Sequence, residues 1–184
     1  LKMHPNKDIA LSTPEQNFIF VIDRSHSIKQ HRYHTFKKAI SKALSQLHEG
    51  DSFNILTIDS KLQAMSTTST PYNKHSLSTA KNYLNGLKFQ GHYPRQNPFF
   101  LLSKASTYFK KDKSNIIIFI TDGHSFDDLT EHKDELIAFN KQHNGSFSLF
   151  TAASSQNNNL AMLDLISTFN PGEMMYSQPN AAFP

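Results

Sequence analysis

The sequence predicts an α/β fold: a doubly wound, mostly parallel six-stranded sheet with one antiparallel edge strand and helices on both faces, a Rossmann-like arrangement. Two apolar runs, 18–22 and 116–120, are rich in β-branched and aromatic residues, as strands buried on both faces are. Amphipathic helical patterns separate the strands, and this alternation is typical of parallel sheets with right-handed crossovers. Asp23 and Asp122 follow the two runs, so their carboxylates are expected to meet at the carboxyl edge of the sheet.

The first third of the chain is expected to hold a lead-in, a strand and a helix. Residues 1–16 contain two prolines and are predicted to be extended. The first buried strand follows at 17–23. Apolar residues then recur every three or four positions over 31–48, which predicts an amphipathic helix, and Gly50 ends it.

The middle of the chain begins with a strand at 53–58. A tight turn leads to a short strand at 61–65, and because the two are so close they are expected to form a hairpin, with the second strand antiparallel at the sheet edge. Residues 66–71 are predicted to form a Ser/Thr loop. Asn73 or Ser76 then starts a second helix, which carries leucines along one face.

The C-terminal half repeats the alternation of helix and strand. The elements expected there are a loop over 88–98, a helix over about 98–111, a strand over 115–121, a helix near 130–143, a strand over 147–152, a helix over about 160–169, a short edge strand over 173–176 and a tail over 177–184. Asp128 and Glu131 have the spacing of a capping box, and the asparagines at 157–159 can cap the last helix. Residues 17–176 are therefore expected to form one domain.

Composition narrows the class of protein. There is no cysteine among the 184 residues, which excludes disulfides, thiolate catalysis and thiolate metal sites. The net charge is +4, but the lysines are scattered, which favours solvated helix faces over a nucleic-acid surface. No stretch approaches the roughly 20 apolar residues of a membrane helix. The chain does not begin with Met, so we interpret it as a processed chain or as part of a longer protein.

The most informative segment is the polar loop DRSHS after the first strand. Asp23, Ser25 and Ser27 place three oxygen donors at alternate positions, and oxygen ligands are what hard cations bind. The alternative is a helix-entry loop in which these side chains cap backbone amides. For Asp122 the alternative is an Asx turn ahead of Gly123.

Three segments, in this order, resemble those of a von Willebrand factor type A domain. They are FVIDRSHS with its D-x-S-x-S pattern, GDSFNILTI at Gly50–Ile58, and IIIFITDG at Ile116–Gly123. Their spacing is most similar to that of the A domains in inter-alpha-trypsin inhibitor heavy chains and their bacterial relatives. The resemblance covers about 18–176, nearly the whole chain.

This resemblance implies a metal-ion-dependent adhesion site that normally holds Mg²⁺ and can take Mn²⁺. Ser25 and Ser27 would offer hydroxyl oxygens directly, while Asp23 and Asp122 would act largely through bound waters. The implied function is protein binding, in adhesion or assembly, with the metal completed by an acidic residue of a partner protein. The resemblance also favours an extracellular or cell-envelope location.

The chain departs from the family pattern in two places. His26 stands where the family usually has Gly. The family also expects a Thr in a third loop, but no Thr or Ser lies within 90–102; Gln96 holds the corresponding position, and Asn97 or Tyr93 could also supply an oxygen. A second hypothesis is therefore an A-type structural or interaction domain whose metal site is degenerate, so that metal binds weakly or not at all.

The rim of the candidate site is expected to be basic. Arg24, His26 and His124 would surround it, which suits an acidic surface on a partner protein. We expect neither nucleic-acid binding nor membrane insertion by this segment.

Catalytic motifs are missing from the sequence. There is no G-x-G-x-x-G, no P-loop and no G-x-S-x-G motif. A phosphotransferase with an aspartate nucleophile would need a second carboxylate where Ser25 stands. We therefore expect a protein that is not an enzyme, and a Mg²⁺-dependent hydrolase is a remote alternative.

Overall fold

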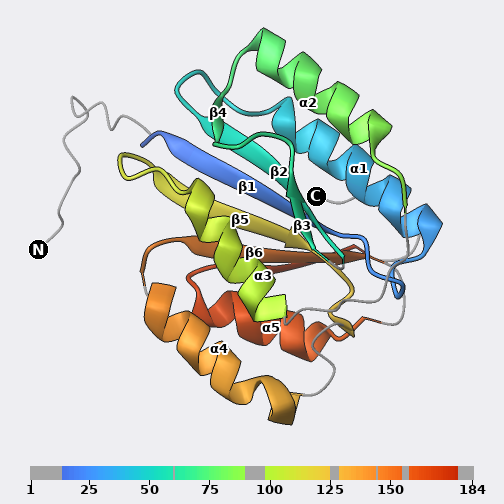
Figure 1. Cartoon of the computed structure of the whole chain (residues 1–184), viewed down its shortest axis with the longest axis vertical. Helices are drawn as coiled ribbons and strands as arrows, with labels where there is room; N and C mark the ends of the chain where they lie inside the picture. Colours follow the sequence, from blue (N-terminus) through green and yellow to red (C-terminus); the bar gives the residue numbers. More distant parts are fainter. Residues whose placement is uncertain are drawn as a thin grey trace, which may run out of the picture.

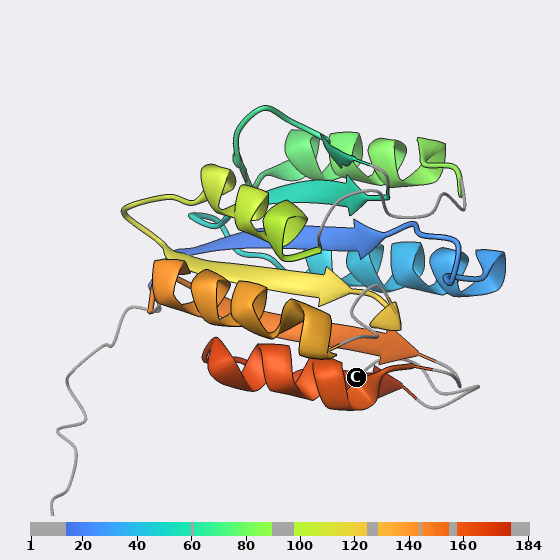
Figure 2. The ribbon, with the colours of Figure 1, turned by 60° about the horizontal axis from the view of Figure 1, so that its bottom comes forward.

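A central sheet with helices on both faces organises the chain (Figures 1 and 2). The computed structural model describes residues 14–59, 61–89, 98–124, 129–143, 145–154 and 158–177. The strand order is β3-β2-β1-β5-β6-β7, with β4 also paired to β2. The parallel strands are β1 (Gln16–Asp23), β2 (Ser52–Ile58), β5 (Ser114–Ile120), β6 (Ser148–Ser154) and β7 (Met174–Ser177). The strands β3 (Leu62–Ala64) and β4 (Thr70–Pro71) run antiparallel to β2.

Strand β1 lies in the middle of the sheet, between β2 and β5. Its side chains are apolar on both faces: Ile19 and Val21 belong to one core cluster, and Phe20 and Ile22 to the other. All four are at most 1% exposed. Figure 2 shows the arrowheads of β1, β2, β5 and β6 at the same edge of the sheet. The loops that follow these strands are therefore neighbours.

Each face of the sheet has its own set of helices (Figures 1 and 2). The helices α1 (Gln30–Leu44) and α2 (Lys74–Gly86) cover one face, and α3 (Pro98–Ala105), α4 (Leu129–His143) and α5 (Leu160–Phe169) cover the other. α1 buries an apolar stripe of four residues, Tyr33, Phe36, Ile40 and Leu44, which is the stripe that predicted this helix. The predicted doubly wound, mostly parallel architecture is confirmed.

The structure differs from the predicted elements in detail. The sheet has seven strands rather than six, because the predicted Ser/Thr loop contains β4. Only two residues, Thr70 and Pro71, pair with β2 there, which is too short for any periodicity to reveal. α1 ends at Leu44 rather than near 48; Leu47 continues the apolar stripe but packs from beyond the helix end. The third helix also ends early, and a 3-10 turn at Ser106–Tyr108 takes its place.

Asparagine side chains begin two of the helices. Asn73, one of the two predicted starts of α2, accepts a hydrogen bond from Ser76 N at 2.8 Å and completes a capping box. Asn159 caps α5 by accepting from Met162 N at 3.2 Å. The predicted Asp128 capping box lies outside the described residues, as do most of the predicted lead-in and tail.

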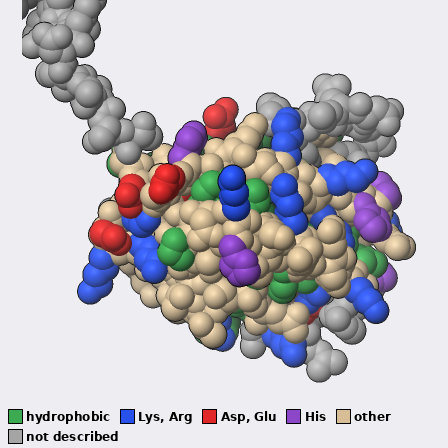
Figure 3. All heavy atoms as spheres, turned by 90° about the horizontal axis from the view of Figure 1, so that it is seen from above, with side chains coloured by type: hydrophobic (Ala, Val, Ile, Leu, Met, Phe, Trp, Pro, Cys, Tyr) green, Lys and Arg blue, Asp and Glu red, His purple; other side chains and the backbone are tan. Residues whose placement is uncertain are grey.

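Basic side chains are spread over the face of the molecule that Figure 3 draws. On the face shown in Figure 3, the Lys and Arg side chains stand apart from one another, as expected of solvated helix faces. Within the described ranges, no helix is long and apolar enough to cross a membrane.

Gly172, between α5 and β7, is expected to tolerate no side chain. A Cβ at this position would overlap the carbonyl oxygen of Leu149 in β6. We expect Gly172→Ala to lower the free energy of unfolding by about 2 kcal/mol or more, as overpacking does, measured by urea denaturation. Gly86→Ala is the matched control, because nothing lies within 4 Å of its added Cβ. Equal stability of the two variants would contradict this account of the β6–β7 edge.

Candidate metal site at the carboxyl edge of the sheet

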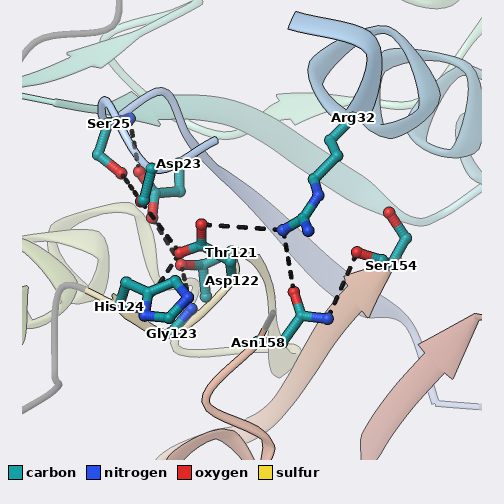
Figure 4. Close-up of polar contacts among 10 residues, drawn as sticks. Asp23, Ser25, Arg32, Thr121, Asp122, Gly123, His124, Ser154 and Asn158 are labelled. Carbon is teal, nitrogen blue, oxygen red and sulfur yellow. Dashed lines mark hydrogen bonds and ion pairs between the residues drawn. The ribbon is translucent and has the colours of Figure 1, made fainter. Parts of the chain in front are cut away.

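The predicted meeting of Asp23 and Asp122 follows from the sheet order. β1 and β5 are adjacent and parallel, so Asp23 at the end of β1 and Asp122 just after β5 reach the same edge. Both side chains are buried: the exposed fractions are 1% for Asp23 and 0% for Asp122. Figure 4 shows them side by side, together with Ser25.

A row of side-chain oxygens, from Ser25 and Ser27 to Asp122, connects the loop after β1 with the loop after β5. The hydroxyls of Ser25 and Ser27 lie 3.0 Å apart and share a hydrogen bond. Ser27 Oγ donates to Asp122 Oδ1 at 3.1 Å, and the same oxygen accepts from His124 N at 3.1 Å. The alternatives weighed from the sequence are thus present in part, because Asp122 does accept from a backbone amide two residues later. The hydrogen bond from His124 N still leaves the hydroxyls of Ser25 and Ser27, on the loop after β1, facing the Asp122 carboxylate.

Asp23 is held in place from both sides. Its Oδ1 accepts from Ser25 N at 2.8 Å, and its Oδ2 accepts from Thr121 Oγ1 at 2.6 Å. Burial raises the pKa of Asp23 to about 6; the hydrogen bonds from Thr121 and Ser25 oppose this rise, and the charge of Asp122 adds to it. The carboxylate is therefore ionised at neutral pH, but at a cost that a bound cation would offset.

Thr121 is a site residue that the sequence prediction missed. It is fully buried, and its hydroxyl also accepts from Gly123 N at 3.1 Å while donating to Asp23. The available signal was its position directly before Asp122. The apolar run before it instead predicts Thr121 as the last residue of the strand.

The oxygen spacing suits a small divalent cation. Magnesium takes six oxygens in near-octahedral geometry at 2.0–2.1 Å, which puts neighbouring ligand oxygens about 3 Å apart. The distances along Ser25, Ser27 and Asp122, 3.0 and 3.1 Å, match this spacing. No three His, Cys, Asp or Glu side chains gather into a metal cage in the part of the chain that the structure describes. A cation at this edge would therefore depend on the hydroxyls as well as on the two carboxylates.

Beside Asp122 lie two polar side chains, Arg32 and Asn158, that the sequence analysis does not predict as part of the site. Arg32 Nη1, from α1, is 3.9 Å from Asp122 Oδ2 and donates to Asn158 Oδ1 at 3.3 Å. Asn158 in turn donates to the carbonyl oxygen of Ser154 at 3.4 Å, so the loop after β6 joins the site (Figure 4).

The predicted rim is only partly present. Arg24 is 2% exposed, and its guanidinium forms an ion pair with Asp59 at 2.9 Å. The backbone explains the error: Arg24 N donates to Ile58 O at 2.8 Å, which continues the β1–β2 pairing. Successive side chains of an extended segment point to opposite sides, so Arg24 turns away from the side that carries Asp23. His26 is exposed, His124 is half-buried beside Asp122, and Gln96 lies outside the described residues.

The fold and the loop pattern define a class of protein. A model of the von Willebrand factor type A domain matches residues 16–174, and the chain belongs to this family. It is 27% identical over 169 residues to inter-alpha-trypsin inhibitor heavy chain H4 of Bos taurus, covering 89% of this chain and 18% of that protein. It is 22% identical over 168 residues to heavy chain H1 of Homo sapiens, covering 88% and 18%. The chain thus spans about a fifth of the length of these relatives.

Solved structures show the same fold. A von Willebrand factor type A protein from Catenulispora acidiphila superposes with a TM-score of 0.77 at 16% identity, covering 91% of this chain and 40% of that one. Proximal thread matrix protein 1 from the mussel byssus, described with a zinc-occupied MIDAS motif, gives a TM-score of 0.59 at 15% identity, covering 91% and 44%.

Proposed function

We propose that this domain is a protein-binding module, of the adhesion or assembly kind, with a metal-ion-dependent adhesion site at the carboxyl edge of its sheet. The observation that carries the proposal is the row of oxygens from Ser25 through Ser27 to Asp122, spaced at 3.0 and 3.1 Å. The zinc-occupied MIDAS motif of the mussel byssus protein supports it by analogy. We propose no catalytic role.

In this proposal each site residue has its own task. Ser25 and Ser27 offer hydroxyl oxygens, and Asp122 supplies Oδ1 beside them. Asp23 adds negative charge from a position that Thr121 and Ser25 N fix. A bound Mg²⁺ or Mn²⁺ would supply a strongly electrophilic centre, because neutral hydroxyls leave its charge largely uncompensated. A carboxylate from a partner protein is the natural group to complete such a centre.

The charge of the domain informs the proposed partner, and the length of the matched relatives informs the proposed location. The chain has a net charge of +4, and His26 lies exposed on the loop that carries the serines. This balance favours an acidic partner surface. We propose an extracellular or cell-envelope location within a longer protein, since the matched heavy chains are several times longer than this chain.

Ser27→Ala tests the metal site, because Ser27 joins the two loops. We expect Mn²⁺ to raise the melting temperature of the wild-type domain by mass action and to leave that of Ser27→Ala nearly unchanged, measured by differential scanning calorimetry. The matched control is Ser45→Ala, at the far end of α1, where the exposed hydroxyl bonds only the Ser41 carbonyl among the contacts described. A full Mn²⁺ response in Ser27→Ala would contradict the proposed ligand set.

A second candidate is an interaction domain whose metal site is degenerate. The ion pair of Arg32 with Asp122 favours it, because the guanidinium already neutralises one carboxylate of the site. This candidate predicts that millimolar Mg²⁺ or Mn²⁺ leaves the melting temperature unchanged. The same calorimetric comparison therefore separates the two candidates.

A further inference from the structure

Arg32 is the cationic side chain that the structure pairs with Asp122. It projects from α1 toward the carboxyl edge of the sheet, as Figure 4 shows, and it is 7% exposed. Three segments meet at its guanidinium: α1 itself, the end of β5 through Asp122, and the loop after β6 through Asn158. A charge so enclosed is screened little by solvent or by salt.

The two oxygens of Asp122 face different groups. Oδ1 accepts from Ser27 Oγ and from His124 N, so it belongs to the row of oxygens. Oδ2 is buried, accepts no hydrogen bond from the described residues, and lies 3.9 Å from Arg32 Nη1. That distance is too long for a hydrogen bond but short enough for a strong Coulomb interaction at low dielectric. Arg32 therefore approaches the oxygen of the carboxylate that is not part of the row formed by Ser25, Ser27 and Asp122.

The charge balance follows from this placement. With both carboxylates ionised, Asp23 and Asp122 carry two negative charges, and Arg32 returns one positive charge to the same buried region. A divalent cation at the row of oxygens meets a site with a net charge of about −1 instead of −2, by Coulomb's law at a few ångströms. In the ion-free protein, the same guanidinium offsets part of the free-energy cost of burying the Asp122 carboxylate.

We propose that Arg32 is a resident counter-cation that sets the divalent-ion affinity of the site, holding it low while stabilising the ion-free domain. This inference rests on the proposed metal site and assigns it a regulator within the chain. In this role Arg32 acts through Asp122. It is too deeply buried to contact a partner protein itself.

The test is isothermal titration calorimetry with Mn²⁺ on four proteins: wild type, Arg32→Gln, Arg32→Lys and Lys38→Gln. We expect Arg32→Gln to bind Mn²⁺ about tenfold more tightly than wild type, because a buried positive charge is removed near the ion. Arg32→Lys keeps the charge and should stay close to wild type. Lys38→Gln removes the same charge from an exposed position of α1 and should also match wild type. The ion-free melting temperature should fall in Arg32→Gln alone.

The outcomes separate this inference from the proposed function. If wild type binds Mn²⁺ and Arg32→Gln binds it equally or more weakly, the inference is overturned and the metal site stands. If Arg32→Gln binds and wild type does not, the inference is supported and the wild-type domain works without metal. If no protein binds, both are overturned. Should Arg32→Gln fail to fold, Arg32→Met provides the second variant, because it removes the guanidinium charge and keeps a long unbranched side chain; it should tighten Mn²⁺ binding, and unchanged binding would overturn the inference.

Discussion

Asp23→Asn is expected to stabilise the ion-free domain at neutral pH while abolishing its response to divalent cations. Burial raises the pKa of Asp23 to about 6 from the ordinary value of 3.8, so folding at neutral pH confines an ionised carboxylate where it is disfavoured. The shift corresponds to about 3 kcal/mol at most by proton linkage. Asparagine retains an oxygen to accept from Ser25 N and removes the charge. Its amide nitrogen cannot accept from Thr121 Oγ1, so the gain falls below this ceiling. Urea denaturation of both proteins at neutral pH measures the gain.

The raised pKa of Asp23 also predicts how the stability difference between Asp23→Asn and wild type changes with pH. Because the folded-state pKa of Asp23 is raised, its stability contribution is complete below about pH 4 and is lost as the pH rises through about 6. The advantage of Asp23→Asn over wild type should therefore shrink between about pH 7 and pH 4. Burial lowers the pKa of His143, which makes acid destabilising in both proteins, so the difference between them is the quantity to follow. A variant less stable than wild type at neutral pH would contradict the account.

Asp59→Asn is expected to produce the largest loss of stability. The Asp59 carboxylate pairs with the Arg24 guanidinium at 2.9 Å, and the two side chains are 2% and 3% exposed. Removing one member of such a pair leaves a buried charge without its counter-charge and costs about 3–5 kcal/mol. Because Arg24 sits between Asp23 and Ser25, the loss should also loosen the loop that carries the serines. Urea denaturation measures the first effect, and Mn²⁺ titration of the folded fraction measures the second.

An ion pair with one exposed member provides the control for this prediction. Glu15 pairs with Lys113 at 3.0 Å, but its side chain is 59% exposed. Glu15→Gln should therefore change the free energy of unfolding by less than about 1 kcal/mol. If Asp59→Asn lowered the free energy of unfolding no more than Glu15→Gln does, the buried Arg24–Asp59 pair would not stabilise the domain as proposed.

Much of the fold could be predicted because the sheet is buried on both faces. The runs ending in Asp23 and Asp122 are nearly continuous in apolar residues, and parallel strands bring such ends to one edge. That argument needs no side-chain detail, and it predicted the meeting of the two carboxylates. The family, now confirmed, was predicted from the resemblance of three segments and not from this argument. The two-residue strand β4 left no periodic signal and could not be predicted in this way.

The missed residues depend on geometry that a single sequence does not contain. The direction of Arg24 is set by the hydrogen bond of its backbone to Ile58 O, a pairing between segments far apart in the chain. Arg32 reaches Asp122 because of the rotation of α1 about its axis and the position of that helix over the sheet. Thr121 is the exception, because a hydroxyl at a strand end beside a carboxylate is a natural donor to the carboxylate of the neighbouring strand.

A calorimetric titration of Mg²⁺ into the wild-type domain, with Asp23→Asn in parallel, tests the central claim most directly. The account predicts saturable binding of one ion per chain to the wild-type protein, in the millimolar range or tighter, and none to the variant. It would be contradicted if a folded wild-type domain gave no saturable heat with Mg²⁺ or Mn²⁺ at millimolar concentrations. Binding of equal strength to Asp23→Asn would contradict it as well, because the ion would then lie somewhere other than beside the row of oxygens at the ends of β1 and β5.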